Sequence, residues 1–358
     1  MSEEKSVTLK SVVKRQKQFF DTDTTKSVAY RIRMLQKLEQ AVRTHEEEIL
    51  SALYQDLSKS KAEAYMTELA IVYSEIHEAL KHVKKWSRPE KVRGTLGTFP
   101  AKSYIYSEPY GVVLILSPWN YPFNLAIAPL VAAISAGNCA IIKCSKESRH
   151  TSKIIEKIIN ETFEERYIFC VDAEIDYDEV LYQNYDYIFF TGSLRVGKII
   201  MRAASENLIP VSLELGGKSP CIIDETADIK FAARRIAWGK LLNAGQTCVS
   251  VDYVVVHSKV KDEFIKALQE EIELRYPNAV NNETYPKIIN QRHYERLLNL
   301  IQTEKDVIGG QKNDEERKIA PTIFPNVEFD HEVMKEELFG PLLPVIEYDD
   351  INKVIRTI

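Results

Sequence analysis

"GVVLILSPWNYPFNLAIAPLVAAISAGNCAIIK", residues 111–143, is the stretch that decides the fold class. It opens on the unbroken apolar run "GVVLILS", which is typical of a parallel strand buried on both faces. A helical pattern follows from about Phe123 to Ala136, and "CAIIK" at 139–143 forms a second strand of the same kind. Parallel strands need a crossover connection, which a helix usually supplies. The segment therefore predicts one strand–helix–strand unit of a parallel sheet.

The same alternation continues toward the end of the chain. "YDYIFFTGS" at 185–193 is a further strand, and a helix follows it from about Val196 to Ala204. The remaining expected strands are "VSLEL" (211–215), "PCIID" (220–224), "YVVVH" (253–257), "APTIF" (320–324) and "LLPVIEY" (342–348), with helices at 229–242, 259–275 and 291–302. This order predicts an α/β fold with a doubly wound parallel sheet of Rossmann type and a second α/β set.

The first hundred residues have a different character. Apolar residues recur near a helical period at 27–57, and a second helical run covers 62–86. The following "SRPEKVRGTLGTFPAKSYIYSEPYG", residues 87–111, is rich in Pro, Gly and small residues. We expect it to form a crossing linker or an extended arm.

Composition excludes several classes of protein. The 358 residues carry a net charge of −5, which leaves no excess of basic residues for binding nucleic acid. "MSEEKSVTLK" lacks the apolar core of a secretory signal, and the longest apolar run, 125–136, is too short to span a bilayer. Five cysteines without framework spacing indicate reduced thiols and a cytoplasmic location. The seven histidines are dispersed, so we expect no metal site.

Three polar residues are candidates for catalysis. Cys248 follows a Gly-Gln-Thr sequence in "LLNAGQTCVSVDY" (241–253). It is either an accessible nucleophile or an ordinary buried thiol. Glu214 lies in the apolar strand of "LELGGKSP" (213–220), where an apolar setting would favour its acid form and suit a general base, unless it is a paired structural residue. Asn120 in "SPWNYPFN" (117–124) is either an oxyanion donor or a turn residue.

A glycine turn and an acidic turn complete the set of candidates. "GSLRVGKI" at 192–199 follows a strand, but Ile199 stands where a P-loop needs Ser or Thr for Mg²⁺. The spacing also departs from the dinucleotide fingerprint, so the turn indicates a generic anion site at a helix N-terminus or a plain connection. "EELFGPLLP" at 336–344 places two carboxylates before an aromatic residue and a Gly-Pro turn.

Together and in this order, these segments resemble the NAD(P)-dependent aldehyde dehydrogenase superfamily, and above all its class 3 (fatty or aromatic aldehyde) branch. The resemblance rests on "EPYGVVLILSPWNYPFNLAIAPLVAAISAGNCAIIK", "FFTGSLRVGKIIM", "LELGGKSP", "RRIAWGKLLNAGQTC" and "EELFGPLLP". It implies a cofactor domain formed by 1–84 and 110–214, a linker or oligomerisation arm at 85–109, and an incomplete catalytic domain at 215–358. It also implies a homodimer, provided that the C-terminal part of the family is present.

The resemblance further implies a mechanism and a set of cofactor contacts. Cys248 would attack the aldehyde, the Asn120 side chain and the Cys248 N–H would hold the oxyanion, and Glu214 would activate water against the thioester. The oxidant would be NAD or NADP. The implied cofactor-binding residues are Trp119, Lys143, Lys146, Gly192, Ser193, Gly197, Glu337 and Phe339.

Two departures from the family pattern change the expectations. Cys144-Ser145-Lys146 stands where the family commonly has Pro-Ser-Glu, and a Lys there would tolerate a 2′-phosphate, so NADP should be used at least comparably to NAD. Val249-Ser250-Val251 replaces the usual residues before Asp252, which should adjust the local turn without removing chemistry.

The length of the chain leaves alternatives open. Family members continue beyond the last helical pattern, 351–358, so we expect a truncated product or a fragment, and a C-terminal membrane anchor would lie in the absent part. The alternatives to an active enzyme are a truncated, non-catalytic cofactor-binding relative and a cofactor-free cysteine hydrolase. The expected substrate of the enzyme is a small-molecule aldehyde, medium- or long-chain aliphatic or aromatic.

Overall fold

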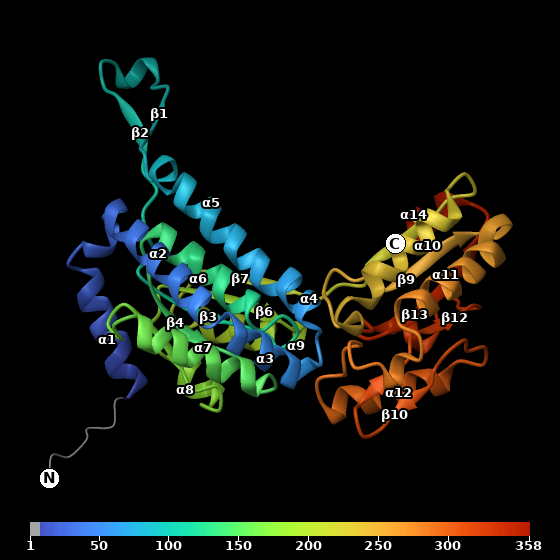
Figure 1. The fold of residues 1–358 in the computed structure, drawn as a ribbon. Coiled ribbons are helices and arrows are strands. Elements are labelled where there is room, and N and C mark those ends of the chain that lie inside the picture. The colour runs from blue at the N-terminus through green and yellow to red at the C-terminus, as the bar shows by residue number, and fades with distance from the viewer. Residues whose placement is uncertain (1–7) are drawn as a thin grey trace, which may run out of the picture. The chain divides into compact units, whose positions relative to one another are not determined.

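The computed structural model describes residues 8–358, which form two compact units (Figure 1). The first unit comprises the chain up to residue 52 together with 65–214, and the second comprises 53–64 together with 215–358. Residues 53–64, which the sequence analysis grouped with the N-terminal helices, belong by their contacts to the C-terminal unit.

A five-stranded sheet forms the centre of the first unit. Its order is β5-β4-β3-β6-β7, and the pairs β5–β4, β4–β3 and β3–β6 are parallel. The strands are β3 (Val112–Leu116), β4 (Cys139–Lys143), β5 (Ile168–Val171), β6 (Tyr187–Gly192) and β7 (Val211–Leu215). Every residue of β3 and β4 is buried, as their continuous apolar sequences require. The doubly wound parallel sheet, predicted from the alternation of strands and helices, is confirmed.

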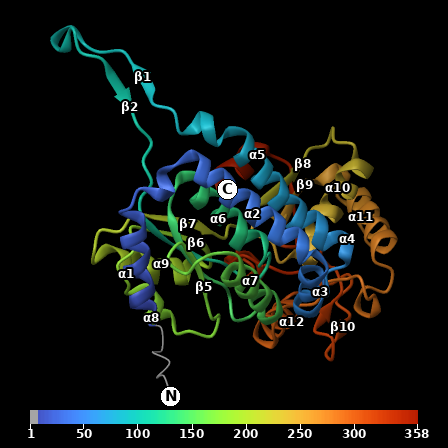
Figure 2. The ribbon, with the colours of Figure 1, turned by 60° about the vertical axis from the view of Figure 1, so that its left-hand side comes forward.

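Helices surround this sheet. They are α1 (Leu9–Phe20), α2 (Val28–Thr44), α5 (Ala70–Trp86), α6 (Asn124–Ala136), α7 (Arg149–Thr162), α8 (Tyr177–Leu181) and α9 (Leu194–Ser205), with a π-helical turn at Tyr65–Leu69. Helix α3 (Glu46–Leu57) begins in the first unit and ends in the second. Helices α2, α5 and α6 pack against one another (Figure 2). The helices cover both faces of the sheet, which leaves the ends of the strands accessible. Open α/β sheets bind ligands at the carboxyl ends of their strands, and polar groups of the loops lie there.

The second unit has a smaller parallel sheet, ordered β12-β13-β9-β8. Its strands are β8 (Pro220–Ile223), β9 (Tyr253–His257), β12 (Thr322–Phe324) and β13 (Leu342–Tyr348). Its helices are α4 (Lys61–Ala64), α10 (Ile229–Leu241), α11 (Lys261–Arg275), α12 (Gln291–Thr303), α13 (Glu332–Lys335) and α14 (Ile351–Thr357), and β10 (Lys312–Asn313) pairs with β11 (Lys318–Ile319). Val254 and Val256 of β9 pack into one core and Val255 into the other, which is the alternation of a strand buried on both faces.

Some elements differ from the expectation. "VSLEL" was expected to open the second α/β set, but β7 is the edge strand of the first sheet, next to β6. Strand β5 and helix α8 were not predicted, because four and five residues are too short to show a period. The helical run at 27–57 breaks at His45 into α2 and α3. Pro129 lies inside α6.

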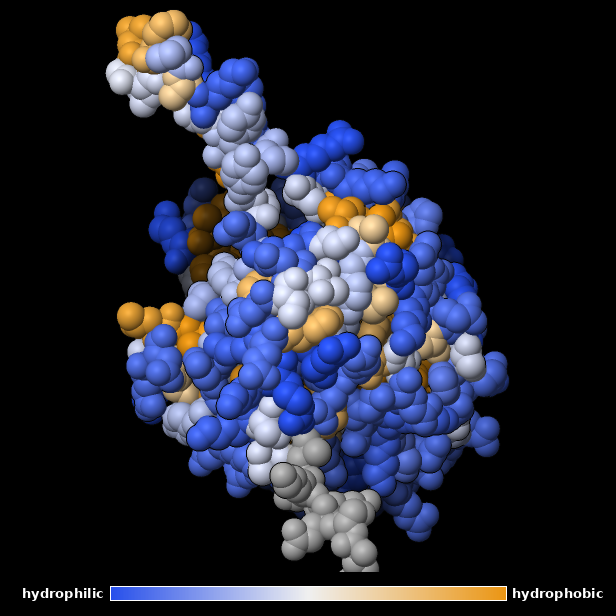
Figure 3. Space-filling model, turned by 90° about the vertical axis from the view of Figure 1, so that its left-hand side faces the viewer, coloured by the Kyte–Doolittle hydropathy of each residue, from blue (hydrophilic) through white to orange (hydrophobic). Residues whose placement is uncertain are grey.

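Residues 87–111 form a ribbon that projects from the first unit (Figures 1 and 2). Strands β1 (Glu90–Val92) and β2 (Ser103–Ile105) pair antiparallel, and apolar side chains gather at the tip (Figure 3). Leu96 is 97% exposed and Phe99 83% exposed. The segment therefore forms an arm whose apolar tip is not covered by any other described residue. A lone two-stranded ribbon has only marginal stability in water.

Candidate active site

Cys248 follows a turn in an uncommon backbone conformation. Three consecutive residues are left-handed: Asn243 (φ 53°), Ala244 (φ 50°) and Gly245 (φ 74°). A left-handed residue with a Cβ atom costs roughly 1–2 kcal/mol, and Ala244 is fully buried. The thiol of Cys248 itself is half-buried. Such a turn persists only where surrounding contacts determine it, and strain of this kind concentrates at functional sites.

The Gln246 side chain supplies part of that support. Its amide nitrogen donates to the carbonyl oxygens of Asn243 and Lys287, each at 3.0 Å, and its amide oxygen accepts from the N–H of Ile289 at 3.0 Å. Gln246 is fully buried. The polar residue before the cysteine therefore braces the turn against the 287–289 loop.

Gly245 is required where two motifs meet. A Cβ atom on Gly245 would lie 2.2 Å from the carbonyl oxygen of Gly340, and its positive φ independently favours glycine. Gly340 belongs to "EELFGPLLP", so the cysteine turn packs directly on the acidic turn. Two segments far apart in the sequence are thus joined in one unit.

An ion pair fixes the acidic turn to the segment after the cysteine. Lys218 and Asp252 pair at 2.6 Å, and the other Asp252 oxygen accepts from the N–H of Leu338 at 3.0 Å. The Lys218 ammonium also donates to the carbonyl oxygens of Val333 and Glu336, each at 2.9 Å. The sequence analysis did not single out Lys218 or this role of Asp252. The signal available was that each residue lies inside one of the quoted motifs.

Glu337 is a half-buried carboxylate on this turn. Gly216 has no room for a side chain, because a Cβ atom there would lie 2.0 Å from a Glu337 oxygen. Burial raises the pKa of Glu337 to about 7, opposed by a hydrogen bond from the Gly217 N–H. The next residue but one, Phe339, is half-buried and left-handed, with φ 50°. Gly216 of "LELGGKSP" thus leaves room for the Glu337 carboxylate, and the Gly217 N–H donates to it.

A buried lysine lies in the electrostatic field of this carboxylate. Lys240 is 3% exposed, and its ammonium has no hydrogen-bond partner among residues 8–358. Burial lowers the pKa of Lys240 to about 8, while the charges of Asp252 and Glu337 act in the opposite direction. In return, Lys240 lowers the pKa of Glu337.

In the first unit, Asn120 and Trp119 follow the carboxyl end of β3. Asn120 is 3% exposed and Trp119 is half-buried. The turn that carries them leads into α6, whose start is held by the buried Glu68, which accepts from the N–H groups of Phe123 (3.0 Å) and Asn124 (2.9 Å). Glu68 was missed by the sequence analysis, since it lies in a helical run with no local signal.

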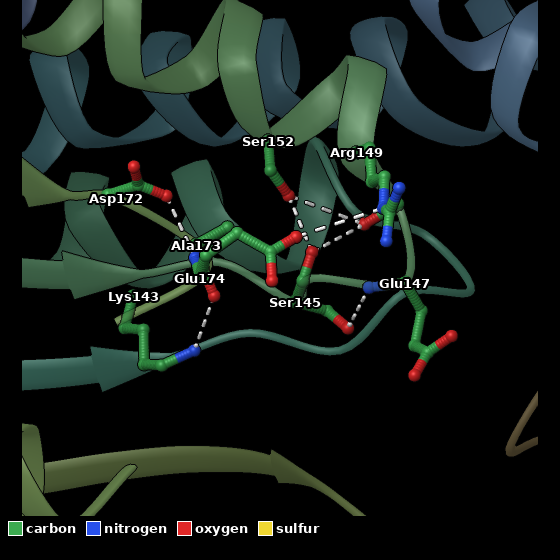
Figure 4. Close-up of polar contacts among 9 residues, drawn as sticks. Lys143, Ser145, Glu147, Arg149, Ser152, Asp172, Ala173 and Glu174 are labelled. Carbon is green, nitrogen blue, oxygen red and sulfur yellow. Dashed lines mark hydrogen bonds and ion pairs between the residues drawn. The ribbon is translucent and has the colours of Figure 1, made fainter. Parts of the chain in front are cut away.

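Lys143 ends the neighbouring strand β4 (Figure 4). Its ammonium donates to the carbonyl oxygen of Ala173 at 3.0 Å and lies 4.6 Å from the centre of the Tyr177 ring. Burial lowers the pKa of Lys143. The loop that follows is ordered by a hydrogen bond from the Ser152 hydroxyl to the carbonyl oxygen of Ser145 at 2.7 Å. Lys146, on the same loop, is exposed.

The glycine turn leads into helix α9 at the end of β6. Ser193 caps the helix by accepting from the N–H of Val196 at 3.4 Å, and the N–H of Gly197 donates to the Ser193 carbonyl oxygen at 2.9 Å. A Cβ atom on Gly192 would lie 2.5 Å from the Phe190 ring. The first N–H groups of this twelve-residue helix form an electropositive end at the carboxyl edge of the sheet.

Glu214 does not have the surroundings that the sequence analysis expected. Its side chain is exposed, so the premise of an apolar setting that favours the acid form is wrong. The reason is that β7 is the edge strand of its sheet. The apolar residues on either side of Glu214 do not indicate an edge position. Glu214 ends the first unit, whereas Cys248, Glu337 and Phe339 belong to the second.

Residues 8–358 contain no group of three His, Cys, Asp or Glu side chains arranged to hold a metal ion. None of their helices has the length and apolar character needed to cross a bilayer.

Comparison with known proteins gives one consistent family. The model of the aldehyde dehydrogenase family matches residues 1–358. The 4,4'-diaponeurosporen-aldehyde dehydrogenase of Staphylococcus aureus is 46% identical over 96% of this chain and 75% of its own length. The dimeric NADP-preferring aldehyde dehydrogenase of Rattus norvegicus is 38% identical over 98% of this chain and 78% of its own.

A solved structure agrees with these relatives. The substrate-bound AldH of Staphylococcus aureus superposes with a TM-score of 0.94 at 44% identity, over 98% of this chain and 77% of that chain. The chain thus spans about three quarters of the length of the relatives it matches. Several relatives are named as aldehyde dehydrogenases of family 3, which confirms the resemblance to class 3. The chain therefore belongs to the aldehyde dehydrogenase family, as an oxidoreductase that converts aldehydes to carboxylic acids with NAD or NADP.

Proposed function

We propose that Cys248 is the nucleophile of this reaction. The observation that carries the proposal is the braced, left-handed turn at Asn243–Gly245, which holds a half-buried thiol three residues after it. The Cys248 sulfur adds to the aldehyde carbon to give a thiohemiacetal. The Asn120 side-chain amide and the Cys248 N–H stabilise its oxyanion by hydrogen bonding. Loss of hydride from that carbon leaves a thioester on Cys248.

Glu214 is proposed as the base that completes the cycle. Its carboxylate takes a proton from water as the water oxygen attacks the thioester carbon, and the Cys248 thiolate leaves. The exposure of Glu214 supports this role, because an exposed carboxylate has access to water. The acid dissociates and Glu214 passes its proton to solvent, which returns Glu214 to the carboxylate and leaves Cys248 as the thiolate for the next cycle.

The described residues fit NAD or NADP. Bound NAD(P) accepts the hydride. Lys143 and the N-terminus of α9, whose turn holds Gly192, Ser193 and Gly197, offer positive charge at the carboxyl edge of the first sheet. In the second unit, Glu337 offers a carboxylate suited to ribose hydroxyls. Trp119 and Phe339 are proposed as apolar contacts, and Lys146 as a contact to a 2′-phosphate.

The substrate is proposed to be an apolar aldehyde, medium- or long-chain aliphatic or aromatic. The name of the Staphylococcus aureus relative, 4,4'-diaponeurosporen-aldehyde dehydrogenase, gives that enzyme an organic aldehyde as its substrate. A homodimer is supported by the apolar tip of the arm at 85–109, which carries Leu96 and Phe99, and by the rat relative named as dimeric. A cytoplasmic location is supported by the five cysteines, none of which forms a disulfide in residues 8–358.

The two catalytic roles have different kinetic signatures. Cys248→Ala should lower aldehyde-dependent NAD(P)H production by at least about a thousandfold, because no covalent adduct can form. Glu214→Gln should lower steady-state turnover about a hundredfold but keep a rapid first burst of NAD(P)H, because only thioester hydrolysis loses its base. Stopped-flow absorbance distinguishes these cases.

Cys221→Ala is the matched control for the cysteine, since Cys221 is a second half-buried free thiol in the same unit. It should keep the wild-type rate. Full activity of Cys248→Ala would refute the nucleophile, and loss of the burst in Glu214→Gln would refute the assignment of the base. Cofactor-free ester hydrolysis without any dehydrogenase activity would favour a hydrolase.

Cofactor affinity should depend on pH through Glu337. The carboxylate binds ribose hydroxyls only when ionised, and with a pKa of about 7 it is ionised above that pH and protonated below it. The ionised fraction falls about tenfold from pH 8 to pH 6, so the Kd of NADH should rise by about that factor. Fluorescence titration measures it. Glu337→Gln should weaken binding and flatten the profile, and a flat profile in the wild type would contradict the assignment.

Lys146 should permit the use of NADP. Initial rates with NADP should be at least comparable to those with NAD, and Lys146→Glu should shift the ratio of kcat/KM values toward NAD by about tenfold or more, because a carboxylate repels a 2′-phosphate. Lys153→Glu, on α7, is the control for the change in charge. A strong preference of the wild-type enzyme for NAD would exclude this role of Lys146.

A further inference from the structure

Glu63, on the short helix α4, contacts the turn before Cys248. Its carboxylate oxygen Oε1 accepts a hydrogen bond from the Asn243 N–H at 2.6 Å, across 180 residues of sequence. Both residues are buried, Glu63 with 6% exposure and Asn243 with none. Asn243 is the first of the three left-handed residues, so this bond holds the turn at its start. A short bond to a carboxylate is among the stronger hydrogen bonds in proteins.

The rest of the 53–64 segment supports the same region from a second side. The carbonyl oxygens of Leu57 and Gln55 accept from the backbone N–H (2.9 Å) and the ammonium (2.7 Å) of Lys287. The carbonyl oxygen of Lys287 in turn accepts from Gln246 at 3.0 Å. One segment, early in the sequence, thus braces both the Asn243 end and the Gln246 side of the cysteine turn.

The charge of Glu63 also acts on tyrosines nearby. The charge of Glu63 contributes, after burial, to raised pKa values of Tyr276 and Tyr285. Tyr285 is fully buried, and its hydroxyl donates to the carbonyl oxygen of Ile319 at 2.9 Å. A carboxylate kept among buried tyrosines is costly unless a specific donor holds it, and the Asn243 N–H is such a donor.

We propose that Glu63 is a positioning residue for Cys248. Its hydrogen bond fixes the left-handed turn, and the turn sets the places of the Cys248 thiol and backbone N–H. The inference rests on the proposed nucleophilic role of Cys248, and it assigns to the N-terminal part of the chain a function in the catalytic unit. Small displacements of a reacting group can cost about a hundredfold in rate, which sets the size of the expected effect.

Three variants separate positioning from simple stability. Glu63→Ala removes the acceptor, Glu63→Asp keeps the charge but is one methylene too short, and Glu63→Gln keeps an oxygen at the right length. Glu273→Gln on α11 is the control, since Glu273 is an exposed glutamate of the same unit. All are assayed well below their melting temperatures, so that loss of folded protein does not contribute.

Two readouts are measured on each variant. The first is kcat/KM for a medium-chain aldehyde. The second is the rate at which iodoacetamide alkylates Cys248, followed by mass spectrometry of the peptide, which needs neither aldehyde nor cofactor. Glu63→Ala and Glu63→Asp should lower kcat/KM about 10- to 100-fold and change the alkylation rate at least about fivefold. Glu63→Gln should stay within about threefold of the wild type in both.

The outcomes distinguish this inference from the function on which it rests. Wild-type values of both readouts in Glu63→Asp would overturn the positioning role, even if Glu63→Ala failed to fold. A glutamine variant as impaired as Glu63→Asp would also overturn it, because a hydrogen-bond acceptor would not be the cause. If wild-type protein showed no aldehyde oxidation, the proposed function would fail, while the alkylation rates would still test the placement of Cys248.

Discussion

The contact between Gly245 and the carbonyl oxygen of Gly340 is the constraint on which the catalytic unit depends. No side chain fits between these two backbones, and only a left-handed residue can make the approach. The contact places the cysteine turn on the turn that carries Glu337. The Lys218–Asp252 pair ties the acidic turn to the segment after the cysteine, and the Gln246 side chain braces the cysteine turn against the 287–289 loop. The proposed nucleophile and the proposed ribose contact thereby share one hydrogen-bonded support.

In the first unit, the order of the strands determines which loops lie together. Its sheet begins at β3 and adds β4 and β5 on one side before it adds β6 and β7 on the other. This order brings the loops after β3, β4 and β6 to one edge, where Asn120, Lys143 and the start of α9 lie. Most of these groups are buried or hydrogen-bonded, so the edge is preorganised and its side chains lose little freedom on binding a ligand.

The features that short stretches of sequence determine could be predicted from the sequence. Continuous apolar runs identified β3, β4, β9 and β13, and the motifs in order identified the family, although Cys248 taken alone was more typical of an ordinary buried thiol. The exposure of Glu214 was not predictable, because it depends on β7 lying at the edge of its sheet. Glu63 was not predictable either, since its partner lies 180 residues away and α4 has only four residues. Contacts between distant segments require the fold itself.

The central claim is that an acyl group forms on Cys248 by oxidation of the aldehyde. Rapid acid quench of the enzyme mixed with aldehyde and NAD, followed by peptide mass spectrometry, tests it directly. The account predicts that the Cys248 peptide gains the mass of the acyl group, that the gain requires cofactor, and that it accumulates in Glu214→Gln. An unmodified Cys248 peptide during turnover, or an acyl group on another residue, would contradict the account.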